Sequence, residues 1–585
     1  MCGIIGYVGK KNAVKEVGEG LLSLEYRGYD SAGISHLLDG QIKTVRAVGF
    51  VSNLLEKVKN EKVDADTIGG IDVAIGHTRW ATHGGVSEAN AHPHRNSNGT
   101  ISVVHNGIIE NYIELRKELE DSGFELYSQT DTEVIPCLIF NYVKSGLTLL
   151  EAVKKTMQRL EGSSAILAIS IENPGEIIAA RRDRQPLNLG LDEHGDAYMS
   201  SDMPTARARC KIVYSLESDE YARITHGKIE FYNEKGKITK TPLALGAAPK
   251  KAEKGEYSTF MEKEINEIPR VISDIAKEYT KIIATDEFKD FIARLKNCGT
   301  LHIAACGTSY HAGLTIAQLL ESLCKIRCKV HVASEMYNEN VFLEQGDIAL
   351  VISQSGETAD TLMALQIFKK HGLYVAAICN VEGSSIYRYS DYSLPSHAGT
   401  EIAVASTKAF IAQAIVGHII KDVLHGNENL EKQFAPFSKG AAEIIAKADQ
   451  VKAMAKQYKD IKNIFFLGKG GGAIIALEAA LKVKEITYRH CEGFPAGELK
   501  HGTLALVDDQ TLNIAISSHD HRKNEKIQNA IAEVGARGSQ VWVLPIPFDS
   551  LLSVIYAQLF ALYLAQEIGN NPDKPRNLAK SVTVD

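Results

Sequence analysis

From about residue 257 onwards, short apolar stretches alternate with longer segments of helical periodicity. The apolar stretches lie at 301–305, 348–353, 374–380, 464–467, 512–517 and 541–545. Strands that are separated by helices at this spacing pair in parallel, because each helix carries the chain back to the same edge of the sheet. The pattern therefore predicts doubly wound α/β sheets in this part of the chain.

The two halves of this region show the same order of features. A strand, a loop at Gly307, a helix and a strand ending at Ser353 are followed by a strand, a loop at Gly468, a helix and a strand ending at Ser517. The loop-to-strand separations are nearly equal, which indicates duplication of one module. The expected segments are a first module at 257–430, a second at 453–575 and a C-terminal tail at 576–585.

The N-terminal part, residues 2–235, has a mixed pattern. Strand-like runs at 73–75, 101–104, 165–169 and 177–180 are interrupted by helical periodicity at 113–119 and 134–142. This mixture predicts an α+β domain. Residues 236–256 contain several lysines and few large apolar groups, which is typical of a surface linker.

Composition narrows the class of function. The net charge is −7 and 44% of the residues are hydrophobic, so we expect no nucleic-acid partner and no membrane surface. With no apolar run long enough for a membrane span and no signal core, we expect a cytoplasmic protein. Nine cysteines without paired spacing predict reduced thiols and no structural metal. The segment His92-Pro93-His94 we interpret as a turn.

The N-terminus carries a possible nucleophile. Removal of Met1 would leave Cys2 with both a thiol and a free α-amino group, which titrates near ~7.7–8.0 and can act as a base. The alternative is an ordinary small residue near a frayed end. Farther along, Arg79 suits a carboxylate, and the Asn106 side chain with the Gly107 N–H suits an oxyanion hole.

Two hydroxyl-rich loops follow strands of the first module. The first contains Thr308 and Ser309, and the second runs from Ser353 to Thr358. Hydroxyls and helix N-termini at the carboxyl ends of parallel strands predict a phosphate site, although the same residues could simply cap helices. The corresponding loops of the second module, 468–472 and 517–520, have fewer hydroxyls, so we expect one phosphate site per chain.

Acid–base groups follow in the second module and the tail. Lys482 and Glu485 lie on one predicted helix, and His501 follows in a glycine-bounded loop. A carboxylate and a histidine near one sugar could move a proton between adjacent carbons and open the ring. A surface ion pair is the alternative for Lys482 and Glu485. Lys580 in the apolar tail could form a Schiff base, unless the tail is a disordered end.

The motifs resemble a known family. Segments 2–4, 25–33, 77–84, 106–107 and 130–133 look like class II glutamine amidotransferases of the N-terminal nucleophile type. Together with 353–358, 498–502 and 577–584, the whole chain is similar to the family of glutamine–fructose-6-phosphate aminotransferases. The resemblance implies a four-layer αββα glutaminase domain followed by two sugar isomerase (SIS) modules.

The resemblance also implies the chemistry. L-Glutamine and D-fructose 6-phosphate would give L-glutamate and D-glucosamine 6-phosphate, without a cofactor or metal, in a homodimer whose SIS modules meet. Cys2 would be the nucleophile, Arg79 and Asp131 would hold glutamine, and Trp80 would gate an ammonia channel. Thr82 and His83 complete the implied glutamine-binding set. The implied sugar-phosphate set is Thr308, Ser309, Ser353, Gln354, Ser355, Thr358, Val404, Ser406 and Ala579.

The implied sugar chemistry uses the second module and the tail. Glu485 would move a proton between C1 and C2, His501 would help open the ring, Lys580 would form the Schiff base, and Lys482 would assist. Thr503 stands where many relatives are expected to have proline, which leaves the local loop shape open. Two other hypotheses remain: an amidotransferase with a different acceptor, and a sugar-phosphate-binding regulator without catalysis.

Overall fold

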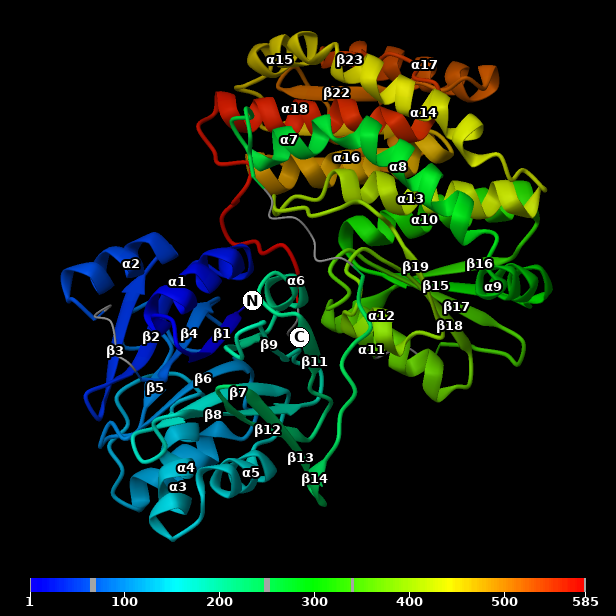
Figure 1. The fold of residues 1–585 in the computed structure, drawn as a ribbon. Coiled ribbons are helices and arrows are strands. Elements are labelled where there is room, and N and C mark those ends of the chain that lie inside the picture. The colour runs from blue at the N-terminus through cyan, green and yellow to red at the C-terminus, as the bar shows by residue number, and fades with distance from the viewer. Residues whose placement is uncertain (1, 64–69, 247–252, 338–340, 583–585) are drawn as a thin grey trace. The chain divides into compact units, whose positions relative to one another are not determined.

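The computed structural model describes residues 2–63, 70–246, 253–337 and 341–582 (Figure 1). Met1, the middle of the expected linker at 247–252 and the last three residues of the tail lie outside the described residues. The chain divides into two compact units, residues 1–250 with 581–585, and residues 251–580. Each unit is described by itself.

The first unit contains two seven-stranded antiparallel sheets in its described part. In spatial order, the first sheet consists of β11 (Ile212–Ser215), β9 (Asn188–Leu191), β10 (Ala197–Ser200), β1 (Gly3–Gly9), β4 (Asp72–Arg79), β2 (Ser31–Leu38) and β3 (Gln41–Val48). The second consists of β14 (Gly236–Ile238), β13 (Lys228–Asn233), β12 (Glu220–Thr225), β8 (Glu176–Arg182), β7 (Ser164–Ser170), β6 (Ile101–Gly107) and β5 (His94–Arg95).

Helices cover the outer faces of both sheets (Figure 1). The described helices of this unit are α1 (Ala13–Leu24), α2 (Val51–Asn60), α3 (Tyr112–Asp121), α4 (Val134–Lys144), α5 (Leu149–Arg159) and α6 (Met203–Arg207), with a 3-10 turn η1 (Glu25–Arg27). Side chains of α1 and α2 pack against the first sheet. Side chains of α3, α4 and α5 pack against the second.

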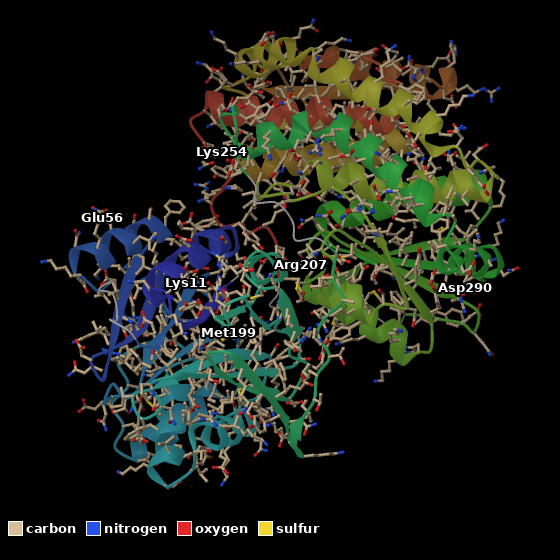
Figure 2. The ribbon with its side chains drawn as sticks, viewed as in Figure 1. Lys11, Glu56, Met199, Arg207, Lys254 and Asp290 are labelled. Atoms are coloured by element: carbon tan, nitrogen blue, oxygen red, sulfur yellow. The ribbon has the colours of Figure 1, made fainter. Side chains whose placement is uncertain are left out.

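The alternation of side chains along β1 explains the layers. Ile4 and Val8 lie in the core between the two sheets, whereas Ile5 and Tyr7 lie in the core under α1. Successive side chains of a strand point to opposite faces, so one buried strand serves two cores. Met199, labelled in Figure 2, lies in the core between the sheets. The expected four-layer αββα arrangement is confirmed.

The expected linker begins later than residue 236. Gly236–Ile238 form β14, which pairs with β13 at the edge of the second sheet. The Leu243 N–H also donates to the Val213 carbonyl at 2.8 Å. The absence of large apolar side chains made this segment resemble a linker, but backbone hydrogen bonds hold it in the first unit.

The second unit contains two parallel sheets with the same strand order. One is β16 (Cys328–Val332), β15 (Leu301–Ala305), β17 (Ile348–Ser353), β18 (Tyr374–Cys379) and β19 (Tyr392–Pro395). The other is β21 (His490–Pro495), β20 (Asn463–Gly468), β22 (Thr511–Ile516) and β23 (Gln540–Leu544). Apart from β19, the two orders match strand for strand, in agreement with duplication of one module.

Helices pack on both sheets of this unit. They are α7 (Phe260–Asn266), α8 (Ile268–Ile282), α9 (Asp286–Asn297), α10 (Gly307–Cys324), α11 (Ala359–Lys370), α12 (Ser385–Tyr389), α13 (Lys408–Leu424), α14 (Leu430–Ile445), α15 (Ala448–Gln457), α16 (Gly471–Thr487), α17 (His521–Gly535) and α18 (Ser553–Glu567). Four 3-10 turns are η2 (Ala333–Glu335), η3 (Ala496–His501), η4 (Thr503–Leu506) and η5 (Ser550–Leu552). Within the described ranges, no helix is sufficiently long and apolar to cross a bilayer.

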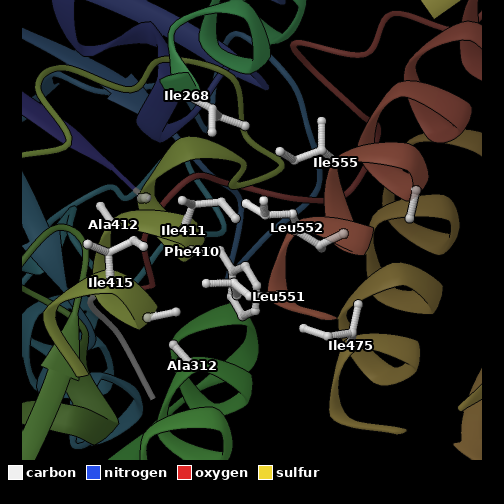
Figure 3. Close-up of a cluster of buried hydrophobic side chains, with 14 of the residues drawn as sticks. Ile268, Ala312, Phe410, Ile411, Ala412, Ile415, Ile475, Leu551, Leu552 and Ile555 are labelled. Atoms are coloured by element: carbon white, nitrogen blue, oxygen red, sulfur yellow. The ribbon is translucent and has the colours of Figure 1, made fainter. Parts of the chain in front are cut away.

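The two modules share one hydrophobic core. Figure 3 shows Ala312 of α10, Phe410 of α13, Ile475 of α16 and Leu552 of η5 converging in it. The predicted module boundaries at 430 and 453 fall inside this arrangement, because α14 begins at residue 430 and α15 continues through residue 453. Both helices contribute buried side chains to the shared core, so they are not a spacer between modules.

Candidate active site

Cys2 lies where strands of both sheets of the first unit meet. It precedes β1, which pairs with β4, and the residue after β4 is Trp80. The Trp80 N–H donates to Cys2 Sγ at 3.4 Å, and from the other sheet Asn106 Nδ2 donates to the Cys2 carbonyl at 3.2 Å. Burial raises the pKa of the Cys2 thiol, and the Trp80 hydrogen bond and the Arg79 charge only partly offset this increase. A base is therefore needed to form the thiolate at neutral pH.

The Asn106 side chain is held in one orientation. His77 Nε2 lies 3.1 Å from Asn106 Oδ1 and 2.9 Å from the His105 carbonyl. Burial lowers the pKa of His77 to about 3, so its ring is neutral. Because Nε2 faces two acceptors, it carries the hydrogen, and Asn106 must present its NH2 group towards Cys2.

Gly107 cannot be replaced without strain. Its φ is +132°, and a Cβ atom there would lie 1.9 Å from the Ser163 carbonyl oxygen. Only glycine adopts this backbone conformation readily. A side chain at this position would therefore clash with the backbone of Ser163.

A cation and an anion flank the cysteine. Arg79 is 3% exposed and binds the carbonyls of Gly84 and Gly85 at 3.2 and 3.3 Å. Asp131 is 5% exposed and accepts from the Ile109 N–H at 2.9 Å. Both charges act on the Cys2 thiol, Arg79 lowering and Asp131 raising its pKa. A buried cation and anion beside one nucleophile match the carboxylate and ammonium groups of an amino acid.

The other expected glutamine-binding residues are on the loop after β4. The ring of Trp80 packs edge-on against Tyr29 with centroids 6.1 Å apart. His83 packs against Tyr112 at 5.4 Å, whereas Thr82 is exposed. Trp80 thus contacts Cys2 directly, while Thr82 and His83 lie on the same loop without a contact to Cys2 among the described residues.

The segment 92–94 is more than a turn. His94 begins β5, and both imidazoles are buried. The His92 ring packs against His77 at a centroid distance of 4.1 Å. Burial lowers the pKa of His92 well below its usual value. The chain bends at 91–92 before β5, in agreement with the turn interpretation, and the two histidines belong to the core beside the Asn106 network. Over the described ranges there is no group of three metal-ligating side chains.

In the second unit, the two hydroxyl-rich loops lie at one edge of the first sheet. β15 and β17 are parallel neighbours, and the loops follow their carboxyl ends. Ser353 Oγ lies 3.0 Å from Thr358 Oγ1 and accepts from the Gly356 N–H at 2.9 Å. Thr358 is the N-cap of α11 but makes no side-chain capping bond. Helix capping therefore does not account for this hydroxyl, whose partner is the Ser353 hydroxyl of the same loop.

The remaining loop residues are half-buried at the same edge. Gln354 and Ser355 belong to the second loop, and Ser355 Oγ accepts from the Glu357 N–H at 3.2 Å. In the first loop, Ser309 Oγ accepts from Gln413 Nε2 at 3.1 Å. Thr308 contacts the acid–base cluster of the second module.

That cluster is largely buried, with the Glu485 side chain 20% exposed. Lys482 has no exposed side-chain surface and lies 2.8 Å from Glu485 and 3.3 Å from Glu478. Its Nζ also donates to Thr308 Oγ1 at 2.9 Å. Burial raises the pKa of Glu485, although Lys482 acts in the opposite direction. The raised pKa favours a carboxyl group that can exchange a proton. The surface ion-pair interpretation is wrong, because α16 is covered on this face by α10.

Sequence reasoning missed two members of this cluster. Glu478 is fully buried, accepts from Thr308 Oγ1 at 3.1 Å and lies 2.7 Å from His311 Nδ1. Glu478 precedes Lys482 by one helical turn, and His311 follows Thr308 by three positions on α10. Residues three or four positions apart lie on the same face of a helix, so these spacings could have indicated both residues from the sequence.

The tail is docked on the second unit as far as Lys580. Arg576 lies over the Tyr488 ring at 4.4 Å, and the Asp573 carbonyl accepts from the Val404 N–H at 3.1 Å. The Lys580 side chain is 2% exposed and pairs with Glu401, a residue that sequence reasoning also missed. The disordered-end alternative is therefore wrong for the described part of the tail. Ser406 Oγ donates to the same Glu401 carboxylate at 2.8 Å, and Ala579 precedes Lys580.

His501 is not part of this cluster within one chain. It ends η3 and is exposed. No hydrogen bond or ion pair joins it to Glu485, Lys482 or Lys580 in the part of the chain that the structure describes.

Comparison with known proteins places the chain in a family. The model of the SIS domain matches residues 294–420 and 457–565, and that of a glutamine amidotransferase domain matches residues 77–208. Proteins named glutamine–fructose-6-phosphate aminotransferase (isomerizing) from Clostridium tetani and Clostridium acetobutylicum are each 41% identical, over 619 and 622 residues, and cover 100% of both chains. The chain belongs to the glutamine–fructose-6-phosphate aminotransferase family. The resemblance in its motifs is thereby confirmed.

A solved structure supports the fold of the second unit. The C-terminal domain of glucosamine-fructose-6-phosphate aminotransferase from Francisella tularensis is 33% identical, with a TM-score of 0.50. It covers 55% of this chain and 100% of that domain. The two segments of this chain that match the SIS model contain the two parallel sheets described above.

Proposed function

We propose that the protein transfers the amide nitrogen of L-glutamine to D-fructose 6-phosphate and isomerises the product, giving D-glucosamine 6-phosphate and L-glutamate. The observation that carries this proposal is that one chain holds both a cysteine site built for an amino acid and a hydroxyl-rich site joined to a buried Lys482–Glu485 pair. Relatives that match over the full length of both chains bear the name of this reaction.

In the glutaminase half-reaction, Cys2 is the nucleophile. Arg79 binds the glutamine carboxylate and Asp131 binds its ammonium group. After removal of Met1, the free α-amine takes the thiol proton, since the buried thiol does not ionise by itself at neutral pH. Asn106 Nδ2 and the Gly107 N–H stabilise the oxyanion of the tetrahedral intermediate. Ammonia leaves, and water then hydrolyses the thioester to glutamate.

In the sugar half-reaction, the hydroxyl-rich loops bind the phosphate and the tail supplies Lys580. Lys580 forms an imine at C2, which ammonia converts to the fructose imine. Glu485 then takes a proton from C1 and returns it to C2, giving the aldehyde and the C2 amine. Lys482 holds Glu485 in position. Acid–base groups and an imine suffice for these steps, so we propose a reaction without a cofactor.

The remaining assignments follow from the same proposal. Residues 2–235 form the glutaminase segment, and the SIS modules bind the sugar phosphate, with Val404, Ser406 and Ala579 near Lys580. Trp80, in contact with Cys2, gates the passage of ammonia. The balanced composition and the substrates favour the cytoplasm.

We also propose a homodimer in which the SIS modules of two chains meet. Its support is His501, which is expected to open the sugar ring but is exposed and separate from the Lys482–Glu485 cluster of its own chain. Mixing a His501→Ala chain with a Lys580→Ala chain should restore activity if the sites combine residues of both chains. Mixed chains that exchange subunits without regaining activity would contradict a shared site.

The proposed function is tested by product analysis. Purified protein with glutamine and a panel of acceptors (fructose 6-phosphate, phosphoribosyl pyrophosphate and aspartate) should release glutamate and form an amino product only with fructose 6-phosphate. Active glutaminase without any amino sugar would refute the assignment of the acceptor. Absence of both activities would favour a sugar-phosphate-binding regulator.

A further inference from the structure

A single buried carboxylate holds Lys580 in place. Glu401 lies between β19 and α13, and its side chain is fully buried. Its Oε2 pairs with Lys580 Nζ and accepts from Ser406 Oγ at 2.8 Å. Its Oε1 accepts from the N–H groups of Thr407 and Ala409 at 2.9 and 3.0 Å, at the start of α13. Glu401 therefore connects the tail, the Val404–Ser406 segment and a helix N-terminus.

The surrounding charges leave Lys580 dependent on Glu401. The other buried lysine of this region, Lys408, forms an ion pair with Glu267, with Nζ 2.7 Å from Oε2. Glu264 is 1% exposed, and no lysine or arginine lies within salt-bridge distance of it in the described part of the chain. Burial and the nearby Glu401 raise the pKa of Glu264, which favours its neutral form. Burial acts in the same direction on Glu401, but Lys580 outweighs it and lowers the pKa of Glu401.

We infer that Glu401 is the positioning residue and fixed counter-ion of Lys580, for the free lysine and for the imine that it forms with the sugar. This inference rests on the proposed function and deepens it. Glu401 acts through Lys580 and Ser406 and needs no contact with the sugar itself.

The charge balance of imine formation explains why one carboxylate suffices. The Lys580 ammonium and a ketone give an iminium ion and water, since two ammonium protons leave with the carbonyl oxygen as the C=N bond forms. The nitrogen carries one positive charge before and after the step. When ammonia displaces the lysine from C2, that charge stays in the same site. A counter-ion held by backbone N–H groups needs no movement at any stage, which is favourable in a buried environment.

The test compares two glutamates of the same cluster. Wild type, Glu401→Gln and Glu264→Gln are incubated with fructose 6-phosphate and sodium borohydride, and the reduced Lys580 adduct is quantified by mass spectrometry of the C-terminal peptide. The Glu401→Gln variant should trap at least ~10-fold less adduct, because it leaves a buried cation unpaired. Glu264→Gln should stay within about twofold of wild type, because it replaces a neutral carboxyl by a neutral amide. Glu401→Asp, which keeps the charge, should recover part of the loss.

The outcomes separate this inference from the proposed function. Thermal unfolding of the second unit serves as the measure of folding in every variant, because the glutaminase site belongs to the first unit. Equal trapping by Glu401→Gln and Glu264→Gln, with adduct formed by wild type, would overturn the inference and leave the proposed function intact. No adduct on wild-type Lys580 would overturn the proposed role of Lys580 and the inference with it. If Glu401→Gln fails to fold, Glu401→Asp gives the decisive result. Reduced trapping with an unchanged unfolding transition of the second unit supports the inference, and unchanged trapping contradicts it.

Discussion

At the scale of single residues, the cysteine site depends on buried polar groups whose orientation is fixed by neighbours. The sequence could name Cys2, Arg79, Asn106 and Asp131, because each lies in a short motif. It could not show that His77 orients the Asn106 amide, since that contact joins two sheets. For the same reason the buried partners Glu478 and Glu401 were missed. The contact of Glu401 with Lys580 joins distant segments and leaves no local pattern, whereas Glu478 left only its spacing of one helical turn from Lys482.

Replacing Asn106 by alanine should lower the glutaminase kcat by about 10²–10³-fold, because one oxyanion donor is lost. The KM for glutamine should change little, since Arg79 and Asp131 bind the substrate. Steady-state glutamate release measures both constants. Asn60→Ala, on the exposed surface of α2, is the matched control and should behave as wild type. A kcat within about twofold of wild type would exclude Asn106 from the oxyanion hole.

At the scale of elements, the strands of the second unit that are apolar throughout were predictable, and three of its edge strands were not. β15, β17, β18, β20 and β22 are continuous apolar runs. The strands that were missed, β16, β19 and β21, lie at sheet edges, where lysine, histidine, serine and glutamate side chains interrupt the pattern. An edge strand faces solvent on one side, so its sequence carries less of the strand signal.

The packing of α13 on α10 requires a glycine. A Cβ atom at Gly417 would lie 2.4 Å from Ile316 Cγ1. Gly417→Ala should therefore destabilise the second unit by about 1–3 kcal/mol, as expected for overpacking a dense core. The control is Gly535→Ala on α17, where a Cβ atom meets nothing within 4 Å. Thermal unfolding of both variants measures the difference, and equal transitions would contradict close packing of these helices.

The neutral carboxyl of Glu264 should make stability depend on pH. Burial and Glu401 raise its folded-state pKa to about 8, so the folded state binds more protons than the unfolded state above pH ~4.3. The stability that Glu264 contributes is complete below the unfolded pKa and is lost as pH rises towards 8. Glu264→Gln does not titrate, so it should gain about 1–3 kcal/mol relative to wild type between pH 5 and 9.

Calorimetric unfolding of wild type and Glu264→Gln at pH 5, 7 and 9 measures this effect. Glu428→Gln, at an exposed position, is the control and should parallel wild type. A difference between Glu264→Gln and wild type that stays constant with pH would show that Glu264 is ionised throughout.

At the scale of the whole molecule, the order of domains was predictable, whereas the core that joins the two SIS modules was not. Near residue 257 the sequence changes from a mixed pattern to alternating strands and helices. This change separates the glutamine amidotransferase match from the SIS matches. The predicted limits of the SIS modules leave α14 and part of α15 between them, as the two SIS matches do, although both helices contribute to one core shared by both sheets. A boundary drawn from composition assumes separate cores, and duplicated modules that share a core do not provide them.

The two half-reactions should be separable by single substitutions. Cys2→Ala should abolish glutamine-dependent synthesis, because the nucleophile is lost, and should spare conversion of the sugar phosphate. Lys580→Ala should abolish conversion of the sugar and leave glutamine hydrolysis. Glutamate release and sugar-phosphate isomerisation are assayed in parallel for each variant. Loss of both activities in folded Cys2→Ala would contradict two distinct sites.

The central claim is that the glutamine amide nitrogen itself reaches C2 of the sugar. The most direct measurement is incubation of the purified protein with amide-15N glutamine, fructose 6-phosphate and excess unlabelled ammonium, followed by mass spectrometry of the amino sugar. We expect one 15N in each glucosamine 6-phosphate formed and an equal amount of glutamate, because ammonia passes between the sites without mixing with solvent. Unlabelled amino sugar, or labelled ammonia with no amino sugar, would contradict it.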